Sequence, residues 1–343
     1  MRYRKYYAVL AAAGLVLSGC CQAYAAKTDN ASREFFAMDT VMSVSVYGED
    51  AEEAVDEAVA LVNRLDAELS TGNEKSEVSR INSAGRGTLS DDGSFLMKKA
   101  LSLYEDTGGL FDITIYPMME LWGFTDGNYR VPGEDEISGV LSLVDASLIE
   151  YDEKTGQVVL TEPGMKIDFG GVAKGYTSAC MAKMLRERGV ESAIINLGGN
   201  VQTVGTKPDG SLWRIGVRDP VNTDSMVGVL SISDTAVITS GGYERFFEEN
   251  GKRYHHIIDP ETGYPADSGL SSVTVITSDG TMADGLSTFL YIAGEEKAAE
   301  YWHKYETAFD MILVRDDGSI LVTEGAAENF STDRDCGIIY KGD

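Results

Sequence analysis

Four glycine-rich polar blocks between residues 164 and 288 constrain this chain more than any other feature. They are residues 167–176 (IDFGGVAKGY), 196–200 (NLGGN), 255–263 (HHIIDPETG) and 283–288 (ADGLST). A hydrophobic core needs few such glycines, histidines and carboxylates, whereas a backbone that approaches a ligand closely often needs glycine. Their order in one chain predicts that the fold brings them together as a single nucleotide- and metal-handling site.

Helical and strand periodicities alternate around these blocks. Apolar residues recur at helical spacing over residues 50–69, and further helices are predicted at 94–106, 171–188, 283–293 and 295–305. Strands are predicted at 41–47, 157–161, 192–196, 212–217, 229–233 and 272–277, with a hairpin at 308–323 that turns at residues 316–318. This alternation predicts an α/β (α+β) fold, organised as a single large domain of two entwined lobes with mixed sheets.

The first residues have the pattern of a bacterial export signal. Arg2, Arg4 and Lys5 precede a short apolar stretch, and residues 17–20 (LSGC) resemble a lipobox. We expect residues 1–19 to be a lipoprotein signal peptide, Cys20 to be lipidated, and residues 20–33 to be a tether. Residues 34–343 would then form a domain held by its lipid anchor at the extracytoplasmic face of the bacterial cell membrane.

The formal net charge of the chain is −26, and loss of residues 1–19 with their three basic groups makes it about −29. Such an acidic chain is a poor partner for nucleic acid, which requires clustered lysine and arginine. Cys180 and Cys336 remain beyond the lipobox region, and their spacing leaves open whether they pair.

The block at residues 167–176 has two interpretations. A short strand at 165–167 would lead through glycines into a helix whose free N–H groups receive an anion, with Lys174 near the second turn. Alternatively, Asp168 is only the N-cap of that helix. The block at 196–200 is predicted to be a tight turn between two strands, and the aromatic loops at 108–114 and 121–124 either stack on a flat ligand or cover the core.

Candidate catalytic and metal-binding residues lie in the last two blocks. The chain has only three histidines, and His256 beside a tight turn is a candidate general base, with His255 as its rival. Asp284 and Thr288 lie four residues apart, on one helical face, and suit a hard cation such as Mg²⁺. The alternative is that Asp284 caps the helix and Thr288 packs inside.

Taken together, these blocks and residues 36–40 (FAMDT) resemble the ApbE family, the FAD:protein FMN transferases. The resemblance runs from about residue 34 to about residue 335 and implies an ApbE or T-fold-like architecture. The other motifs that carry it are 109–114 (GLFDIT), 122–124 (WGF), 168–176 (DFGGVAKGY), 196–200 (NLGGN), 239–242 (TSGG), 256–263 (HIIDPETG) and 283–288 (ADGLST).

The resemblance implies that FMN is transferred from FAD to a Thr or Ser hydroxyl of an acceptor, a flavin-binding electron-transfer protein outside the cytoplasm, with release of AMP. It assigns His256 as the base and assigns magnesium to Gly171, through its carbonyl, and to Asp284 and Thr288. The FAD site would be lined by Met38, Leu110, Phe111, Asp112, Asp168, Lys174 and Ile258.

Two positions depart from the family pattern. Many members carry an aromatic residue where this chain has Gly72, and many carry an acidic residue near Ser178. Two other functions fit the same motifs: a Mg²⁺-dependent FAD pyrophosphatase that passes FMN to water, and a lipoprotein that binds flavin without chemistry. The histidine beside the Asp284–Thr288 pair favours an enzyme, because a binding protein needs no base.

Overall fold

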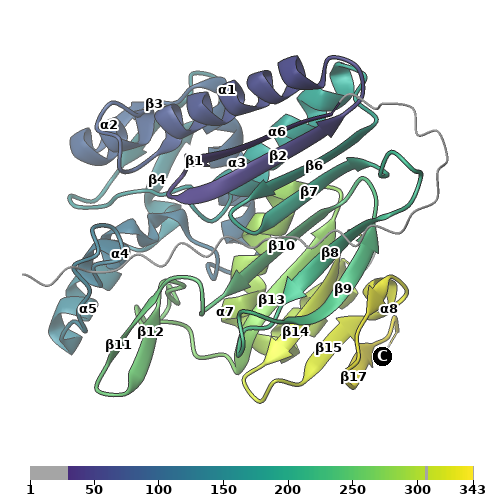
Figure 1. Ribbon diagram of the computed structural model, residues 1–343. Coiled ribbons are helices and arrows are strands. Elements are labelled where there is room, and N and C mark those ends of the chain that lie inside the picture. Colours follow the sequence, from purple (N-terminus) through teal and green to yellow (C-terminus); the bar gives the residue numbers. More distant parts are fainter. Residues whose placement is uncertain (1–29, 306–307, 343) are drawn as a thin grey trace, which may run out of the picture.

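A nine-stranded sheet runs through the computed structural model, which describes residues 30–305 and 308–342 (Figure 1). Its order is β1-β2-β6-β7-β10-β13-β14-β15-β17, and all neighbours are antiparallel except the parallel pair β15 and β17. The strands are β1 Asn30–Ala37, β2 Thr40–Tyr47, β6 Ser192–Leu197, β7 Asn200–Gly205, β10 Ala236–Gly241, β13 Leu270–Thr277, β14 Asp310–Arg315, β15 Ile320–Thr323 and β17 Cys336–Ile339. The predicted single mixed α/β domain is confirmed.

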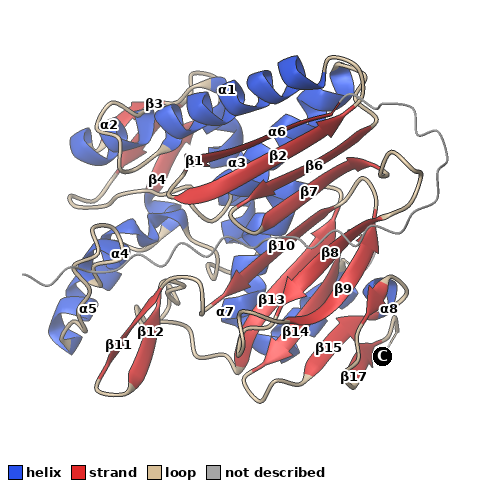
Figure 2. Ribbon diagram, viewed as in Figure 1, coloured by secondary structure: helices blue, strands red, loops and turns tan. Residues whose placement is uncertain are grey.

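Helices cover one face of this sheet and a smaller sheet covers part of the other (Figure 2). The covering helices are α1 (Ala51–Leu69), α6 (Ala173–Glu187) and α7 (Gly280–Lys304), and the smaller sheet joins β16 (Phe330–Ser331), β9 (Met226–Ile232) and β8 (Trp213–Arg218). Because side chains alternate along a strand, β14 contributes to both cores: Met311 and Leu313 pack on the helix side, and Ile312 packs with Trp213.

The remaining elements lie outside the central sheet. They are α2 Glu77–Ala84, β3 Arg86–Thr88, α3 Asp91–Asp106, α4 Tyr116–Leu121, α5 Glu134–Leu141, β4 Ile149–Asp152, β5 Gln157–Leu160, the β11–β12 hairpin (Phe246–Glu249 and Lys252–His255) and α8 Glu324–Ala327. Strands β3, β5 and β4 form a third sheet, and β11 and β12 form a two-stranded one. Short 3-10 turns at Ile113–Ile115 and Ala146–Leu148 complete the fold.

The strongly periodic segments fold as predicted, with differences at their ends. Helix α1 spans the predicted segment, and the hairpin of β14 and β15 turns at the predicted residues. Helix α3 begins three residues early because the Ser90 side chain accepts a bond from the Gly93 N–H and caps it. The two helices predicted at 283–293 and 295–305 are both present within α7, and they meet at the predicted boundary, where Gly294 is non-helical with a φ of 80°.

The strand predicted at residues 165–167 does not form, and that prediction is wrong. The Asn82 side chain takes the place of a neighbouring strand: its Nδ2 donates to the Ile167 carbonyl at 2.8 Å and its Oδ1 accepts from the Ile167 N–H at 2.7 Å. Asp168 also does not cap α6, whose N-cap is Val172 and whose first residue is Ala173.

The N-terminal predictions fall largely outside the described residues. Residues 1–19, Cys20 and the tether up to residue 29 belong to the part that the structure leaves undescribed, whereas residues 30–33, predicted as tether, belong to β1. The thiols of Cys180 and Cys336 are both free, so they do not pair in this structure. Within residues 30–305 and 308–342, no helix has the length and apolar content needed to cross a membrane.

Candidate active site

A cavity of about 540 Å³ lies where the turn between β1 and β2, the start of α6, the middle of α7 and the segment after β12 converge. All eleven residues that the sequence proposes for substrate, metal and catalysis lie along its walls. They are Met38, Leu110, Phe111, Asp112, Asp168, Gly171, Lys174, His256, Ile258, Asp284 and Thr288. The structure thus brings together residues that lie up to 250 positions apart in the chain.

The carboxylate of Asp284 joins three elements at the base of this cavity. Its Oδ2 accepts a bond of 2.8 Å from the Gly175 N–H of α6, and its Oδ1 accepts one of 2.9 Å from Nδ2 of Asn200 at the start of β7. Asp284 lies inside α7, whose N-cap is Asp279, so it is not the cap of that helix. Burial raises the pKa of the Asp284 carboxyl, and the nearby Lys174 cation opposes that rise.

Glycine allows α6 and α7 to approach closely enough for these bonds. A Cβ on Gly175 would lie 2.1 Å from the Gly280 carbonyl oxygen and 2.6 Å from Cβ of Asp284. A Cβ on Gly280 would lie 2.8 Å from the Gly175 carbonyl oxygen. Neither helix accepts a side chain at this crossing without moving, so Gly175 in the first block has a packing reason as well as a role beside the cavity.

The oxygen atoms around Asp284 fit a hard cation. Thr288 Oγ1 lies 3.5 Å from the Asp284 carbonyl oxygen and 3.3 Å from Ser240 Oγ, and Gly171 lies on the cavity wall. The described residues hold no cluster of three or more acidic, histidine or cysteine side chains suited to a metal. The set is instead one buried carboxylate, one hydroxyl and one main-chain carbonyl, which suits Mg²⁺ when substrate phosphates supply further ligands.

The two adjacent histidines lie in different environments. His255 is buried, its Nε2 lies 3.0 Å from the Ala266 carbonyl oxygen and 3.2 Å from the Tyr291 hydroxyl, and it does not line the cavity. His256 is half-buried and lines the cavity, and its Nδ1 lies 3.2 Å from the Arg245 carbonyl oxygen. A carbonyl oxygen can accept a hydrogen bond but cannot donate one, so the Nδ1 atom must carry the proton. In the neutral ring, Nε2 is then an acceptor.

The electrostatic surroundings keep His256 neutral. Burial, together with the cations of Arg245 and Lys174, lowers the pKa of His256 to about 3. A general base must be unprotonated when it acts, and an imidazole with this pKa is unprotonated throughout the neutral range.

The two aspartates expected at the FAD site differ in what their carboxylates do. Asp112 is buried and accepts bonds from the Thr114 N–H at 2.7 Å, the Thr114 hydroxyl at 2.6 Å and the Ala146 N–H at 3.0 Å. It therefore holds the loop of Leu110 and Phe111 in place. Asp168 accepts from a single donor among the described residues, the Gly170 N–H at 2.9 Å, and burial raises the pKa of its carboxyl.

The sequence analysis missed the residues that directly follow the motif at 239–242. Tyr243, Glu244 and Arg245 line the cavity, as does Arg218 from the end of β8. The Arg245 guanidinium donates to the Phe124 carbonyl at 2.6 Å, which ties the β11–β12 side of the cavity to the aromatic loop at 121–124. The sequence signal for residues 243–245 was that they directly follow the motif at 239–242.

Gly72, where many family members carry an aromatic residue, is not among the residues that line the cavity. The aromatic walls come from Phe111 and Tyr243. The Phe111 ring lies against Gly171, where a Cβ would be 3.0 Å from Cε2 of that ring.

The fold and the cavity define a mixed α/β enzyme domain with an acidic, oxygen-rich pocket beside a neutral histidine. Residues 38–313 match the model of the ApbE family, and the chain belongs to that family. An FAD:protein FMN transferase of Klebsiella pneumoniae is 37% identical over 287 residues, 80% of this chain and 88% of that protein. Another, from Treponema pallidum, is 30% identical over 318 residues, 87% of this chain and 88% of that protein.

Solved structures agree with these relatives. The ApbE protein of Thermotoga maritima has a TM-score of 0.82 and 32% identity, and the alignment covers 90% of this chain and all of that one. The flavin transferase ApbE of Vibrio cholerae has a TM-score of 0.78 and 27% identity over 88% of this chain and 99% of that one. The resemblance stated from the motifs is thereby confirmed.

The neutral state of His256 leads to a prediction for the ligand-free protein. Because its pKa is about 3, the His256 imidazole signals should stay at their neutral positions as the pH falls from about 8 to about 5. An ordinary histidine, with a pKa of about 6.5, converts to the charged form over that range. NMR of the histidine-labelled protein, with His256→Gln to assign the peak, makes the measurement. A midpoint near 6.5 would contradict this electrostatic account.

Proposed function

We propose that this protein transfers the FMN part of FAD to a Thr or Ser hydroxyl of another protein and releases AMP. Its family and the names of its relatives support this function. The observation that carries it is the placement of a neutral histidine, with a free Nε2, in the same cavity as the buried Asp284 and Thr288.

The reaction exchanges one phosphorus–oxygen bond for another. The acceptor hydroxyl oxygen attacks the phosphorus of the FMN half, and the bond from that phosphorus to the bridging oxygen breaks. AMP leaves with the bridging oxygen, and the hydroxyl proton moves to Nε2 of His256. A hydroxyl is a weak nucleophile at neutral pH, so a base held at this position lowers the barrier.

The pyrophosphate is held by oxygen ligands and cations. Asp284, Thr288 and the Gly171 carbonyl would hold Mg²⁺, which neutralises charge on the phosphates when bound. Lys174, Arg218 and Arg245 add fixed positive charge to the walls of a cavity that lies in a strongly acidic chain. Phosphoryl transfer depends mainly on such neutralisation and on alignment, and both are supplied by residues that the fold holds in place.

The acceptor and the location follow from the same proposal. The acceptor is a flavin-binding electron-transfer protein with a Thr or Ser in a short exposed segment. The enzyme works at the extracytoplasmic face of the cell membrane, where a lipid on Cys20 would hold it close to such acceptors.

Mutation of the histidines tests the base. His256→Ala should lower FMN transfer by about 10²–10⁴-fold, the usual effect of losing a general base, while FAD binding persists on the other cavity walls. His303→Ala, near the end of α7, serves as the control and should transfer normally. Transfer is measured as protein-bound flavin fluorescence after denaturation. Loss of transfer in His255→Ala, with normal transfer in His256→Ala, would assign the role to His255.

Two variants of α7 separate metal binding from stability. Thr288→Val removes one oxygen ligand without touching the hydrogen bonds of the Asp284 carboxylate, so it should raise the Mg²⁺ concentration needed for half-maximal AMP release by about ten-fold or more. Asp284→Asn should also raise the Mg²⁺ requirement. In addition, it should lower the free energy of unfolding by about 1–3 kcal/mol, because the new NH₂ group would face one of the two buried donors that the carboxylate now accepts from.

The matched control is Thr281→Val, because Thr281 is a buried threonine of α7 that does not line the cavity. Magnesium titrations of AMP release and urea unfolding provide the two readouts. An unchanged magnesium dependence in both Thr288→Val and Asp284→Asn would refute the assignment.

The anchor is tested by Cys20→Ala in the full-length chain. This change should abolish lipid attachment and move the protein from the membrane fraction to the soluble fraction, or leave an unprocessed precursor. Fractionation and the mass of the N-terminal peptide report the outcome. Normal processing with unchanged membrane attachment would show that Cys20 is not the lipidated residue.

A further inference from the structure

Exposed apolar side chains lie on three segments beside the cavity. On the β1–β2 hairpin, Phe36 and Val41 form a cross-strand pair and are 68% and 57% exposed. In the loop between β8 and β9, Val221 is 73% exposed, and on β11 Phe246 is 37% exposed. We call these four residues the apolar rim. Single exposed apolar residues are common, but a set that gathers around one opening indicates an interaction surface.

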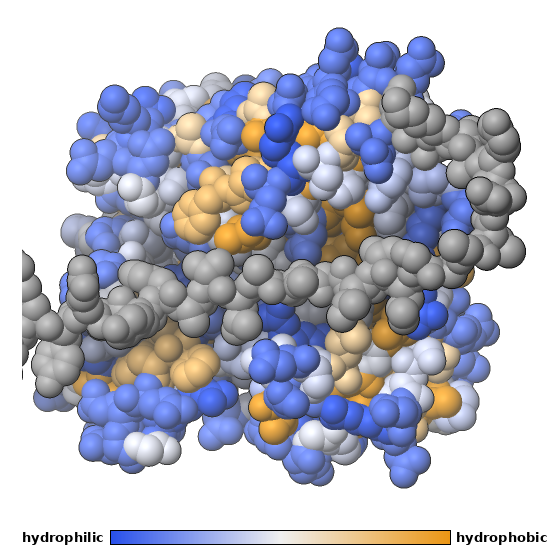
Figure 3. Space-filling model, viewed as in Figure 1, coloured by the Kyte–Doolittle hydropathy of each residue, from blue (hydrophilic) through white to orange (hydrophobic). Residues whose placement is uncertain are grey.

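Two of these segments contribute to the cavity wall, and the residues on either side of the third do so as well. The β1–β2 turn supplies Met38, Asp39 and Thr40, and the β8–β9 loop supplies Thr223. Strand β11 follows Arg245, which lines the cavity. Figure 3 shows hydrophobic surface at the β1–β2 turn and again over the β11–β12 hairpin. A molecule seated on the rim therefore lies directly over the opening.

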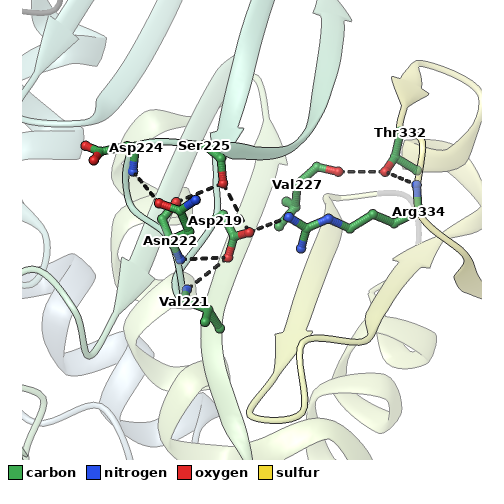
Figure 4. A network of polar contacts seen from close by, with 8 residues as sticks. All are labelled: Asp219, Val221, Asn222, Asp224, Ser225, Val227, Thr332 and Arg334. Atoms are coloured by element: carbon green, nitrogen blue, oxygen red, sulfur yellow. Dashed lines mark hydrogen bonds and ion pairs between the residues drawn. The ribbon is translucent and has the colours of Figure 1, made fainter.

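The β8–β9 loop is fixed in a shape that keeps Val221 in solvent. The Asp219 carboxylate accepts bonds from the N–H groups of Val221, at 2.9 Å, and Asn222, at 3.3 Å (Figure 4). Arg334, from the C-terminal segment, forms an ion pair with the same carboxylate. Hydrogen bonds that hold an apolar side chain outward favour a preformed contact surface, because little ordering remains to be done on binding.

The β11–β12 hairpin presents its apolar side chain in a similar way. The Arg253 guanidinium lies over the Phe246 ring, 4.1 Å from its centroid, so the ring stays in place while one face is covered by a cation. This hairpin pairs with no other strand among the described residues, and His256 follows its last residue. The proposed base, His256, is thus the residue that directly follows this hairpin.

We propose that the apolar rim is the docking surface for the acceptor protein, which presents its Thr or Ser on a turn flanked by apolar side chains. This inference rests on the proposed function, since a reaction on a protein hydroxyl requires a second polypeptide at the mouth of this cavity. A polypeptide large enough to reach all three segments can insert one hydroxyl toward His256 while its apolar neighbours stay on the rim. The rim then supplies binding, and the cavity supplies the chemistry.

Charge substitutions on the rim provide the test. Val221→Asp and Phe36→Asp should raise the KM for a purified flavin-binding electron-transfer domain with a single accepting threonine by about ten-fold each, the effect of losing one buried apolar contact. The value of kcat should stay within about two-fold, and FAD affinity, measured by fluorescence, should be unchanged. Val159→Asp on β5 is the control, because Val159 is an exposed valine that neither lines the cavity nor belongs to the rim.

An unchanged KM in both rim variants would overturn the proposal. The proposal would also fail if the rim variants kept the same acceptor KM but lost binding to phosphatidylglycerol vesicles, or lost a dimer in size-exclusion chromatography. Those results would assign the rim to the membrane or to a second copy of the chain. If the unmodified protein transferred no flavin at all, the proposed function would fail, and that outcome is distinct from a rim variant with normal transfer.

Discussion

The buried carboxylate of Asp284 is the interaction on which the site depends. It receives a backbone N–H from α6 and a side-chain amide from β7, so it fixes the positions of two helices and a strand of the central sheet. The contact exists only because Gly175 and Gly280 let the helices approach without side chains between them. These two hydrogen bonds only partly compensate a buried anion. The nearby Lys174 cation adds to them, and a bound metal cation would complete the surroundings of the carboxylate.

The second half of the site follows from strand alternation at the end of β12. Adjacent residues of an extended chain point in opposite directions, so the backbone sends His255 into the interior, beside Ala266 and Tyr291, and His256 into the cavity. The Arg245 carbonyl then fixes the proton of His256 on Nδ1. His255 therefore packs in the interior, whereas the next residue, His256, faces the cavity.

Much of this could be predicted from the sequence, because the signals were local. The periodicity of α1, the turn at residues 196–200 and the shared face of Asp284 and Thr288 depend on residues only a few positions apart. Features that depend on distant residues escaped prediction. Asn82 replaces a strand partner for Ile167, which lies 85 residues away, and Arg334 fixes a loop that lies 115 residues away. No local pattern at Asn82 or Arg334 indicates these contacts.

The order of the motifs predicted which residues line the cavity. The contacts that each of these residues makes could be seen only in the structure. Asp112 illustrates the difference: its carboxylate is used entirely by Thr114 and Ala146. The most direct test of the whole account is to count products in one reaction that contains the protein, FAD, Mg²⁺ and an acceptor domain. The account predicts one AMP released for each FMN that remains on the acceptor after denaturation. AMP that accumulates without attached flavin would contradict it.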